Sequence, residues 1–152
     1  IEGFHVAFDA VARERRFLTF LEAPSLADTR HFVLSSMAKG NPHFIALVDG
    51  KVIGWCDIIR HGLPSHAHRG SLGMGLLPEH RGGGIGTRLI EAALREAWGN
   101  SFTRIELSVH ADNDSAISLY ERSGFVREGL VRDAFQVDGV YRDAISMAII
   151  RR

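Results

Sequence analysis

The sequence contains a single cysteine, Cys56, among its 152 residues, so no disulfide can form within the chain. It has no apolar run near the roughly 20 residues that a membrane helix needs, and it does not begin with the pattern of a signal peptide. Net charge is also lacking, because 18 Lys and Arg balance 18 Asp and Glu. We therefore expect a cytoplasmic protein that binds neither nucleic acid nor a membrane surface.

The composition favours one compact domain over residues 1–152. Hydrophobic residues make up 45% of the chain, which is enough for a core at this length. The sequence contains no internal repeat, linker or low-complexity segment.

Two helices are predicted near the N-terminus. Apolar residues at helical spacings from Val6 to Phe20 indicate a first amphipathic helix that ends before Pro24. Ser25, followed three residues later by Asp28, is typical of a helix cap, and the second helix is expected to run to about Gly40.

The remaining sequence indicates two hairpins around a crossover. Asp49-Gly50 and Asp138-Gly139 are typical of tight turns between strands. Between the hairpins, a strand, a helix and a strand follow one another, and a connection of this length makes the two strands parallel. Strands are expected at residues 43–48, 51–59, 72–77, 104–109, 126–137 and 140–150, and the later helices at 85–98 and 112–122.

A cluster of glycines, Arg81-Gly82-Gly83-Gly84-Ile85-Gly86, stands where a strand gives way to a helix. Glycine has no Cβ, so its backbone N–H groups can approach an anion closely, and the N-terminus of the helix adds positive potential. A phosphate or pyrophosphate is therefore the expected ligand. Thr87 and Arg88 stand where a nucleotide triphosphate loop needs Lys and Ser or Thr, and Leu89 stands where a dinucleotide fold needs its third glycine.

Two segments resemble the signatures of one enzyme family. Leu76 to Leu89 resembles motif A of the GNAT acyl-CoA N-acetyltransferases, whose pattern Arg/Gln-x-x-Gly-x-Gly/Ala is matched by Arg81, Gly84 and Gly86. The segment from Asn113 to Phe125 is similar to the family's pattern Asn-x-x-Ala-x-x-Leu-Tyr-x-x-x-Gly-Phe. The likeness extends roughly over residues 44–150 and is strongest to acetyltransferases of protein N-terminal alanines and of amino acids or phosphinothricin.

The resemblance implies a fold, an activity and a cofactor site. The implied fold is an α/β sandwich with a mixed, mostly antiparallel sheet, a central splayed parallel pair and about four helices. The implied activity is acetyl transfer from acetyl-CoA to a primary amine of a small molecule, most plausibly an amino acid, or of a protein N-terminus, by direct attack in a ternary complex. Tyr120 is the implied proton donor to the leaving thiolate. The implied cofactor contacts are Met74, Gly75, Leu76, Arg81, Gly82, Gly83, Gly84, Ile85, Gly86, Thr87 and Asn113.

The general base departs from the family pattern. Relatives often place a glutamate at the positions that match Gly73 and Ser108, and neither residue here can accept a proton. Strand alternation puts Glu106 and His110 on the same face as Ser108, so these two are candidate bases. His68 and Asp57 are further candidates. Because the usual base is missing, the alternative function is a non-catalytic acyl-CoA-binding module.

The sequence also allows expectations about the acceptor contact, metal binding and assembly. Glu22, in the segment between the first two helices, is expected to contact the acceptor amine. The histidines at 61, 66 and 68 lack supporting acidic or thiol ligands, so no metal site is predicted. Family members usually begin with a strand, for which only Glu2 to Phe8 is available, and a homodimer is expected to cover a sheet edge left open there.

Overall fold

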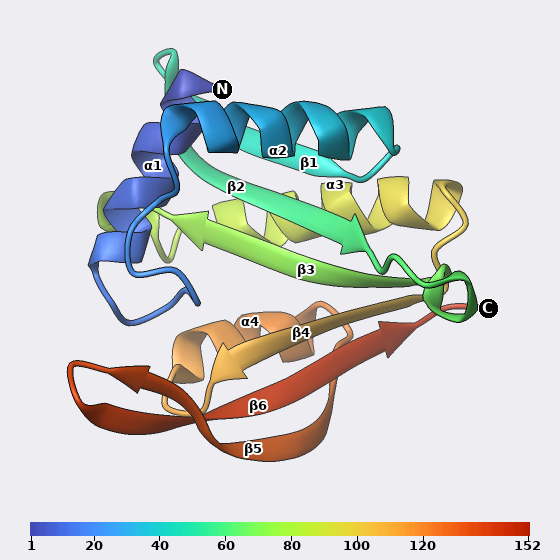
Figure 1. The fold of residues 1–152 in the computed structure, drawn as a ribbon. Helices are drawn as coiled ribbons and strands as arrows, with labels where there is room; N and C mark the ends of the chain where they lie inside the picture. The colour runs from blue at the N-terminus through green and yellow to red at the C-terminus, as the bar shows by residue number, and fades with distance from the viewer.

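The computed structural model describes residues 1–152 as one six-stranded sheet with two helices on each face (Figure 1). Helices α1 and α2 lie on one face, and α3 and α4 on the other. The strands lie in the order β1-β2-β3-β4-β6-β5. The elements are α1 (Glu2–Arg13), α2 (Leu26–Ala38), β1 (His43–Val48), β2 (Lys51–Arg60), β3 (Arg69–Leu76), α3 (Ile85–Gly99), β4 (Arg104–His110), α4 (Asp114–Arg122), β5 (Val126–Val137) and β6 (Val140–Ile150).

The sheet is mixed, and its only parallel pair is β3 with β4. These two strands pair only from Arg69 to Ser71 against Arg104 to Glu106. β3 continues to Leu76 and β4 to His110 without further pairing between them, so the strands separate toward their C-terminal ends. The predicted fold class, with its central splayed pair, is confirmed.

Both hairpin turns have the predicted chemistry. Asp49 and Gly50 have φ values of 50° and 77°, and Asp138 and Gly139 have 52° and 78°. Positive φ at both central residues is the type I′ geometry, which matches the twist of the flanking strands. The two hairpins therefore supply the outer strand pairs, β1–β2 and β6–β5.

The expected bounds of the first helix are wrong at both ends. Residues Glu2–Arg13 are helical, so the strand expected at Glu2 to Phe8 does not form, and the helix begins before Val6. The helix ends because Arg15 adopts a left-handed conformation, with φ of 57°. Its buried face consists of Phe4, Ala7, Val11 and Ala12, at spacings of three, four and one.

The second helix is confirmed within two residues of its expected ends. The Ser25 side chain caps it by accepting a hydrogen bond from the backbone N–H of Asp28, at 3.1 Å. None of the helices is both long and apolar enough to cross a membrane.

Two apolar clusters hold the layers together. The larger one packs α3 and α4 against one face of the sheet, around Ile58, Ile90, Ile105 and Met147. The smaller one packs α1 and α2 against the other face, around Phe4, Val33, Ile53 and Trp55. The region where β3 and β4 separate therefore lies in the interior, between the two layers of helices.

Candidate functional site: a cleft in a splayed sheet

The splay exposes backbone hydrogen-bonding groups in the middle of the sheet. From Leu72 onward, β3 pairs with β2 on one side, but it pairs with no strand on the side that faces β4. β4 likewise pairs with β6 along its whole length. Unpaired strand edges bind extended chains through main-chain hydrogen bonds. The segment Met74–Leu76 therefore offers an edge to a linear polar ligand.

The glycine turn lies at the start of α3. Gly82 and Gly84 have φ values of 83° and 88°, which L side chains rarely adopt. A Cβ at Gly82, Gly83 or Gly84 would meet no atom within 4 Å, so the backbone there faces open space. Gly84 is the N-cap residue, and no side chain caps the helix.

The amides of this turn lack partners within the chain. None of the backbone N–H groups from Gly82 to Thr87 donates to a carbonyl oxygen in the turn or to a side chain. The first N–H groups of a helix lack intrahelical acceptors, and the helix dipole adds about half a positive charge there. The turn is therefore a strong candidate for binding a pyrophosphate.

Gly86 has a different role from the glycines before it. A Cβ at Gly86 would lie 3.0 Å from Leu119 Cδ2 and 3.5 Å from Met74 Cε. The missing side chain allows α3 to pack closely against α4 and β3. Two of the glycines thus permit left-handed backbone, whereas Gly86 permits close packing.

The structure joins the glycine turn and the splay in one cleft of about 290 Å³. The cleft is lined by residues of β3, the turn, α3, β4 and α4, and by Val11 and Phe17 from the other layer. Of the residues predicted from the sequence, those in its lining are Met74, Gly75, Leu76, Arg81, Gly82, Gly84, Gly86, Thr87, Asn113 and Tyr120. Gly83 and Ile85 are outside the lining, and Ile85 packs against the apolar clusters instead.

Arg81 closes the cleft toward α1. Its Nη1 donates to the Glu14 carboxylate at 3.0 Å, and its Nε donates to the carbonyl oxygen of Leu76 at 3.0 Å. The guanidinium carbon also lies 4.7 Å from the ring centre of Phe17. The side chain is therefore held in place at the edge of the glycine turn, with its charge paired to the Glu14 carboxylate.

Tyr120 and Asn113 line the cleft from α4. Tyr120 is 9% exposed, and its hydroxyl makes no hydrogen bond within the chain. Burial, with the nearby Cys56, raises the pKa of Tyr120, so the hydroxyl stays protonated at neutral pH and can donate. Asn113 caps α4 by accepting from the Ala116 N–H at 3.2 Å through Oδ1. Its amide NH₂ remains available to a ligand.

A second cavity, of about 400 Å³, lies on the opposite face of the sheet under α1 and α2. Met74 lines both this cavity and the first. Aromatic residues dominate its walls, and Gly73 and Asp57 lie among them. The sequence predicted an acceptor contact at Glu22, between the first two helices, but it did not predict the aromatic lining, whose residues are far apart in the chain. The aromatic residues in the lining are Phe4, Phe8, Phe20, Phe32 and Trp55.

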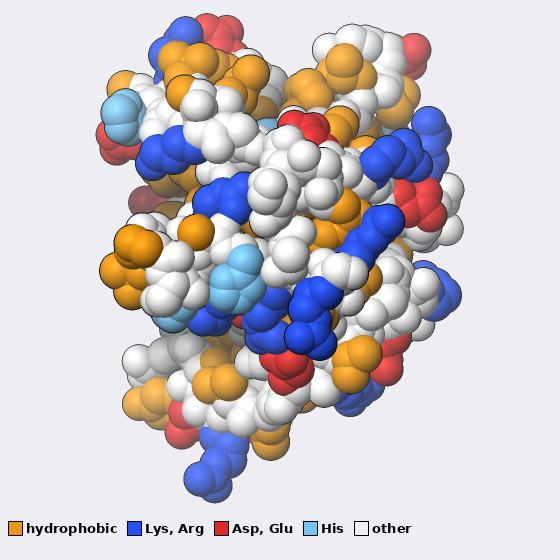
Figure 2. All heavy atoms as spheres, turned by 90° about the vertical axis from the view of Figure 1, so that its right-hand side faces the viewer, with side chains coloured by type: hydrophobic (Ala, Val, Ile, Leu, Met, Phe, Trp, Pro, Cys, Tyr) orange, Lys and Arg blue, Asp and Glu red, His pale blue; other side chains and the backbone are white.

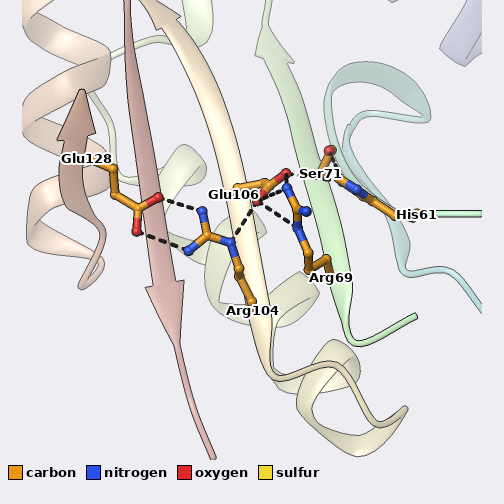
Figure 3. A network of polar contacts seen from close by, with 6 residues as sticks. All are labelled: His61, Arg69, Ser71, Arg104, Glu106 and Glu128. Carbon is orange, nitrogen blue, oxygen red and sulfur yellow. Dashed lines mark hydrogen bonds and ion pairs between the residues drawn. The ribbon is translucent and has the colours of Figure 1, made fainter. Parts of the chain in front are cut away.

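Glu106 does not face either cavity, because it is held in an ion-pair network at the closed end of the splay (Figure 3). Arg69 contacts it through Nη2 at 2.7 Å, and Arg104 through Nε at 2.8 Å. His61 lies 3.2 Å from the same carboxylate, and Glu128 pairs with Arg104 on the far side. Partial burial raises the pKa of Glu106, but the hydrogen bonds from the two arginines outweigh it and lower the pKa overall. A carboxylate held in this way is a weak base, so the geometry disfavours the expected role of Glu106.

His110 is disfavoured for a different reason. It is only 2% exposed, and its ring stacks on Phe135 with centroids 4.2 Å apart. Strand alternation placed it on the same face of β4 as Glu106 and Ser108, where Phe135 of β5 covers it. It lines neither cavity, and burial lowers its pKa.

Of the remaining polar candidates, Asp57 lines the second cavity, whereas Glu22 and His68 lie away from both cavities. Glu22 is exposed and contacts Arg13 at 3.4 Å. His68 precedes β3 at the end where β3 and β4 pair, on the right in Figure 1. Figure 2 looks onto this end and shows basic and histidine side chains across the middle of the face. No group of three or more His, Cys, Asp or Glu side chains is arranged to hold a metal ion.

Comparison with known proteins gives one consistent family. The model of the acetyltransferase (GNAT) family matches residues 9–125. N-alpha-acetyltransferase RimI of Mycobacterium tuberculosis is 34% identical over 112 residues, which cover 73% of this chain and 68% of that protein. Spermidine N(1)-acetyltransferase of Escherichia coli is 29% identical over 140 residues, which cover 91% of this chain and 71% of that protein.

Solved structures show the same fold. Ribosomal-protein-alanine N-acetyltransferase from Brucella melitensis superposes with a TM-score of 0.92 at 20% identity, covering 99% of this chain and 93% of that one. Phosphinothricin acetyltransferase from Sinorhizobium meliloti, solved in complex with acetyl-CoA, gives 0.92 at 20% identity, covering 98% and 82%.

Proposed function

Because the chain belongs to the acetyltransferase (GNAT) family, whose members use acetyl-CoA as the acetyl donor, we propose that it acetylates a primary amine of a small molecule or a protein N-terminus. The observation that carries this proposal is the continuous cleft, in which unpaired helix amides stand at one end and a protonated tyrosine at the other. Acetyl-CoA fits both ends of the cleft, because it carries a pyrophosphate near one end and a thioester at the other. The whole of residues 1–152 is proposed to act as one domain.

The two ends of the cleft do different work. The amides of residues 82–87, with Arg81 beside them, would hold the pyrophosphate. The open edge of β3 at Met74–Leu76 would align the pantetheine arm by main-chain hydrogen bonds. Together they would fix the thioester near Tyr120 and Asn113, where the sheet opens onto the second cavity. Gly83 and Ile85 would contribute backbone N–H groups only.

Tyr120 is proposed to donate a proton to the leaving sulfur. A thiol has an ordinary pKa of about 8.5, so a thiolate leaves more readily when a donor stands beside it. The Tyr120 hydroxyl is protonated and makes no bond within the chain. Cys56 is not proposed as an acyl carrier, because burial raises the pKa of its thiol.

The acceptor is proposed as an amine because the relatives act on amines. Their names specify an N-alpha position in one case and spermidine in another. The proposed reaction is direct attack of the acceptor on the thioester within a ternary complex, and it is supported by two cavities that share Met74 in their linings. Neither cavity is lined by a cysteine.

The test is thiol release from acetyl-CoA with a panel of primary amines, comparing wild type with Tyr120→Phe. Wild type is expected to turn over at least one amine, and the variant to lose about tenfold or more in kcat. Calorimetry should show equal coenzyme A binding by both. Coenzyme A binding without turnover of any amine would instead favour the alternative, a non-catalytic acyl-CoA-binding module.

Location and assembly follow as smaller proposals. The unpaired Cys56 supports a cytoplasmic location. β1 is an edge strand with exposed Ile45 and Leu47, and this edge supports a homodimer that covers it. Sedimentation of the protein at micromolar concentration tests the second of these.

A further inference from the structure

The register between β2 and β3 places a carboxylate beside Gly73, a residue that has no side chain of its own. Asp57 stands directly opposite Gly73 in the pairing of the two strands. A Cβ built on Gly73 would lie only 3.2 Å from Asp57 Oδ1. The Asp57 carboxylate therefore occupies space that a side chain at residue 73 would otherwise enter.

Asp57 lies in the wall of the second cavity without a partner. It is 9% exposed, and neither a backbone N–H nor a side chain donates a hydrogen bond to its carboxylate. A buried carboxylate that accepts no hydrogen bond is costly, since its desolvation is not offset. An isolated acid at the wall of an apolar cavity is the kind of feature that function retains at the expense of stability.

The chemistry of the cavity restricts what it can hold. Its lining contains five aromatic side chains and the two carboxylates of Asp57 and Asp28, but no Lys, Arg or His. A free amino acid would bring its own carboxylate into this space without a cation to pair with it. An amine on an apolar body satisfies both the walls and the acids.

We propose that Asp57 is the general base of acetyl transfer, and that the second cavity selects acceptor amines with an apolar body and no free carboxylate beside the nitrogen. The proposal rests on the acetyltransferase function proposed above. It deepens that function by naming the base and the acceptor class, either an arylalkylamine or an N-terminal residue whose carboxyl is in a peptide bond.

The proton balance is complete with the residues present. The incoming ammonium passes one proton to the Asp57 carboxylate and becomes a neutral amine. The nitrogen then bonds to the thioester carbonyl carbon as the carbon–sulfur bond breaks, and Tyr120 protonates the departing sulfur. The second proton lost by the nitrogen restores Tyr120, and Asp57 releases the first to water, so ammonium and acetyl-CoA give amide, thiol and one proton.

The surroundings of Asp57 tune it for this step. Burial raises the pKa of Asp57 to about 7, where it is both ionised and basic enough near neutral pH. His43 of β1 stands opposite it, and burial lowers the pKa of His43, which keeps that ring neutral. Asp28 of α2 lines the same cavity, whereas α1 presents Phe4 and Phe8 there. No cation therefore competes with the acceptor for the carboxylate.

The first test is the pH profile of kcat/KM for 2-phenylethylamine with the full chain and acetyl-CoA. Wild type should rise to a plateau above about pH 7, because the productive forms are the ionised Asp57 and the ammonium. Asp57→Ala should lose about 100-fold or more at pH 7.5, and its profile should keep rising toward the pKa of the amine, about 10. A purely structural role would lower the whole profile without changing its shape.

Two further variants sharpen the result. The double variant Asp57→Ala/Gly73→Glu moves the carboxylate from β2 to the opposite position on β3. It should restore part of the activity and the plateau of the pH profile. Glu91→Gln removes an exposed carboxylate from α3 and should retain the wild-type profile. Calorimetry of coenzyme A binding to each variant shows whether the fold and the cleft survive.

The outcomes separate the two proposals. Wild-type turnover matched by Asp57→Ala, in rate and in profile, overturns the assignment of the base but leaves the acetyltransferase function intact. Failure of wild type to acetylate any amine overturns both. If Asp57→Ala no longer binds coenzyme A, its lost activity does not test the base, and the double variant decides. Failure of the double variant to restore the plateau overturns the assignment.

The acceptor class is tested on the wild-type enzyme. 2-Phenylethylamine and phenylalanine amide should exceed free phenylalanine in kcat/KM by about tenfold or more, because only the last carries an unpaired carboxylate. A preference for phenylalanine would overturn the selection against carboxylates. A preference for spermidine would overturn the selection for an apolar body.

Discussion

Replacing Asp57 with asparagine is expected to stabilise the protein at neutral and alkaline pH while leaving its stability at pH 4 nearly unchanged. Asparagine has the shape of the protonated acid but no charge to bury. In the folded protein, burial raises the pKa of Asp57 to about 7 from an ordinary value of 3.8. Between these two values the folded state holds a proton that the unfolded state has released, so wild-type stability falls as pH rises through this window.

The size of the effect follows from the shift. One unit of pKa corresponds to about 1.4 kcal/mol, so a difference of roughly three units sets an upper limit near 4 kcal/mol. Water that enters the cavity screens part of this, and we expect about 2 to 4 kcal/mol at pH 8. For a chain of this length, each kcal/mol moves Tm by about 2 to 4 °C.

The measurement is urea unfolding of wild type and Asp57→Asn at pH 4, 6 and 8, with Glu91→Gln as the control for an exposed carboxylate. The free energy gained by Asp57→Asn should grow with pH, whereas that of the control should stay constant. A variant no more stable than wild type at pH 8, or a gain that does not depend on pH, would refute the claim that this carboxylate is buried without compensation.

Three other substitutions test separate parts of the structure. Gly84→Ala should lower stability by about 1 to 2 kcal/mol, because residue 84 has a left-handed backbone, and it should weaken acetyl-CoA binding. Gly99→Ala, at the other end of α3, should have neither effect. Calorimetry that shows equal acetyl-CoA binding by the two variants would contradict this. Gly75→Ala should destabilise by about 1 to 3 kcal/mol, because its Cβ would lie 2.4 Å from the Trp55 ring, and an unchanged Tm would argue against that packing. Glu106→Gln should cost about 1 to 3 kcal/mol at pH 7 but keep the plateau of the activity profile, and a lost plateau would return Glu106 to the role of base. Because the folded pKa of Glu106 is lowered from its ordinary value of 4.5, the loss of stability should shrink as pH falls below that value and through the lower folded pKa.

Much of the fold was predictable because its signals are local. The Asp-Gly turns fix both hairpins through two residues each, and the glycine cluster marks the start of α3. The alternation of strand, helix and strand was enough to predict the parallel pair. The residues that line the first cleft were also largely predictable, because most of them belong to two continuous segments of the chain.

The bounds of the first helix and the surroundings of the candidate bases were not predictable in the same way. Phe17 and Phe20 continue the apolar pattern of α1 in the sequence, but the helix ends before them, near Arg15. The chain then folds back, and the Phe20 ring packs on the Phe8 ring with centroids 5.6 Å apart. Asp57 becomes a good candidate for the base only when the register sets it opposite Gly73. Alternation along β4 identified an outward face, but it gave no sign that arginines hold Glu106 there.

The central claim is that acetyl-CoA binds in the cleft between β3 and β4 with its pyrophosphate on the turn that begins α3. Amide hydrogen exchange, measured with and without acetyl-CoA, tests it most directly, because the amides of residues 82–87 have no acceptor within the turn. The account predicts that acetyl-CoA slows exchange in two segments above all, residues 74–76 and 82–87. Unchanged exchange in both segments at saturating acetyl-CoA would contradict it.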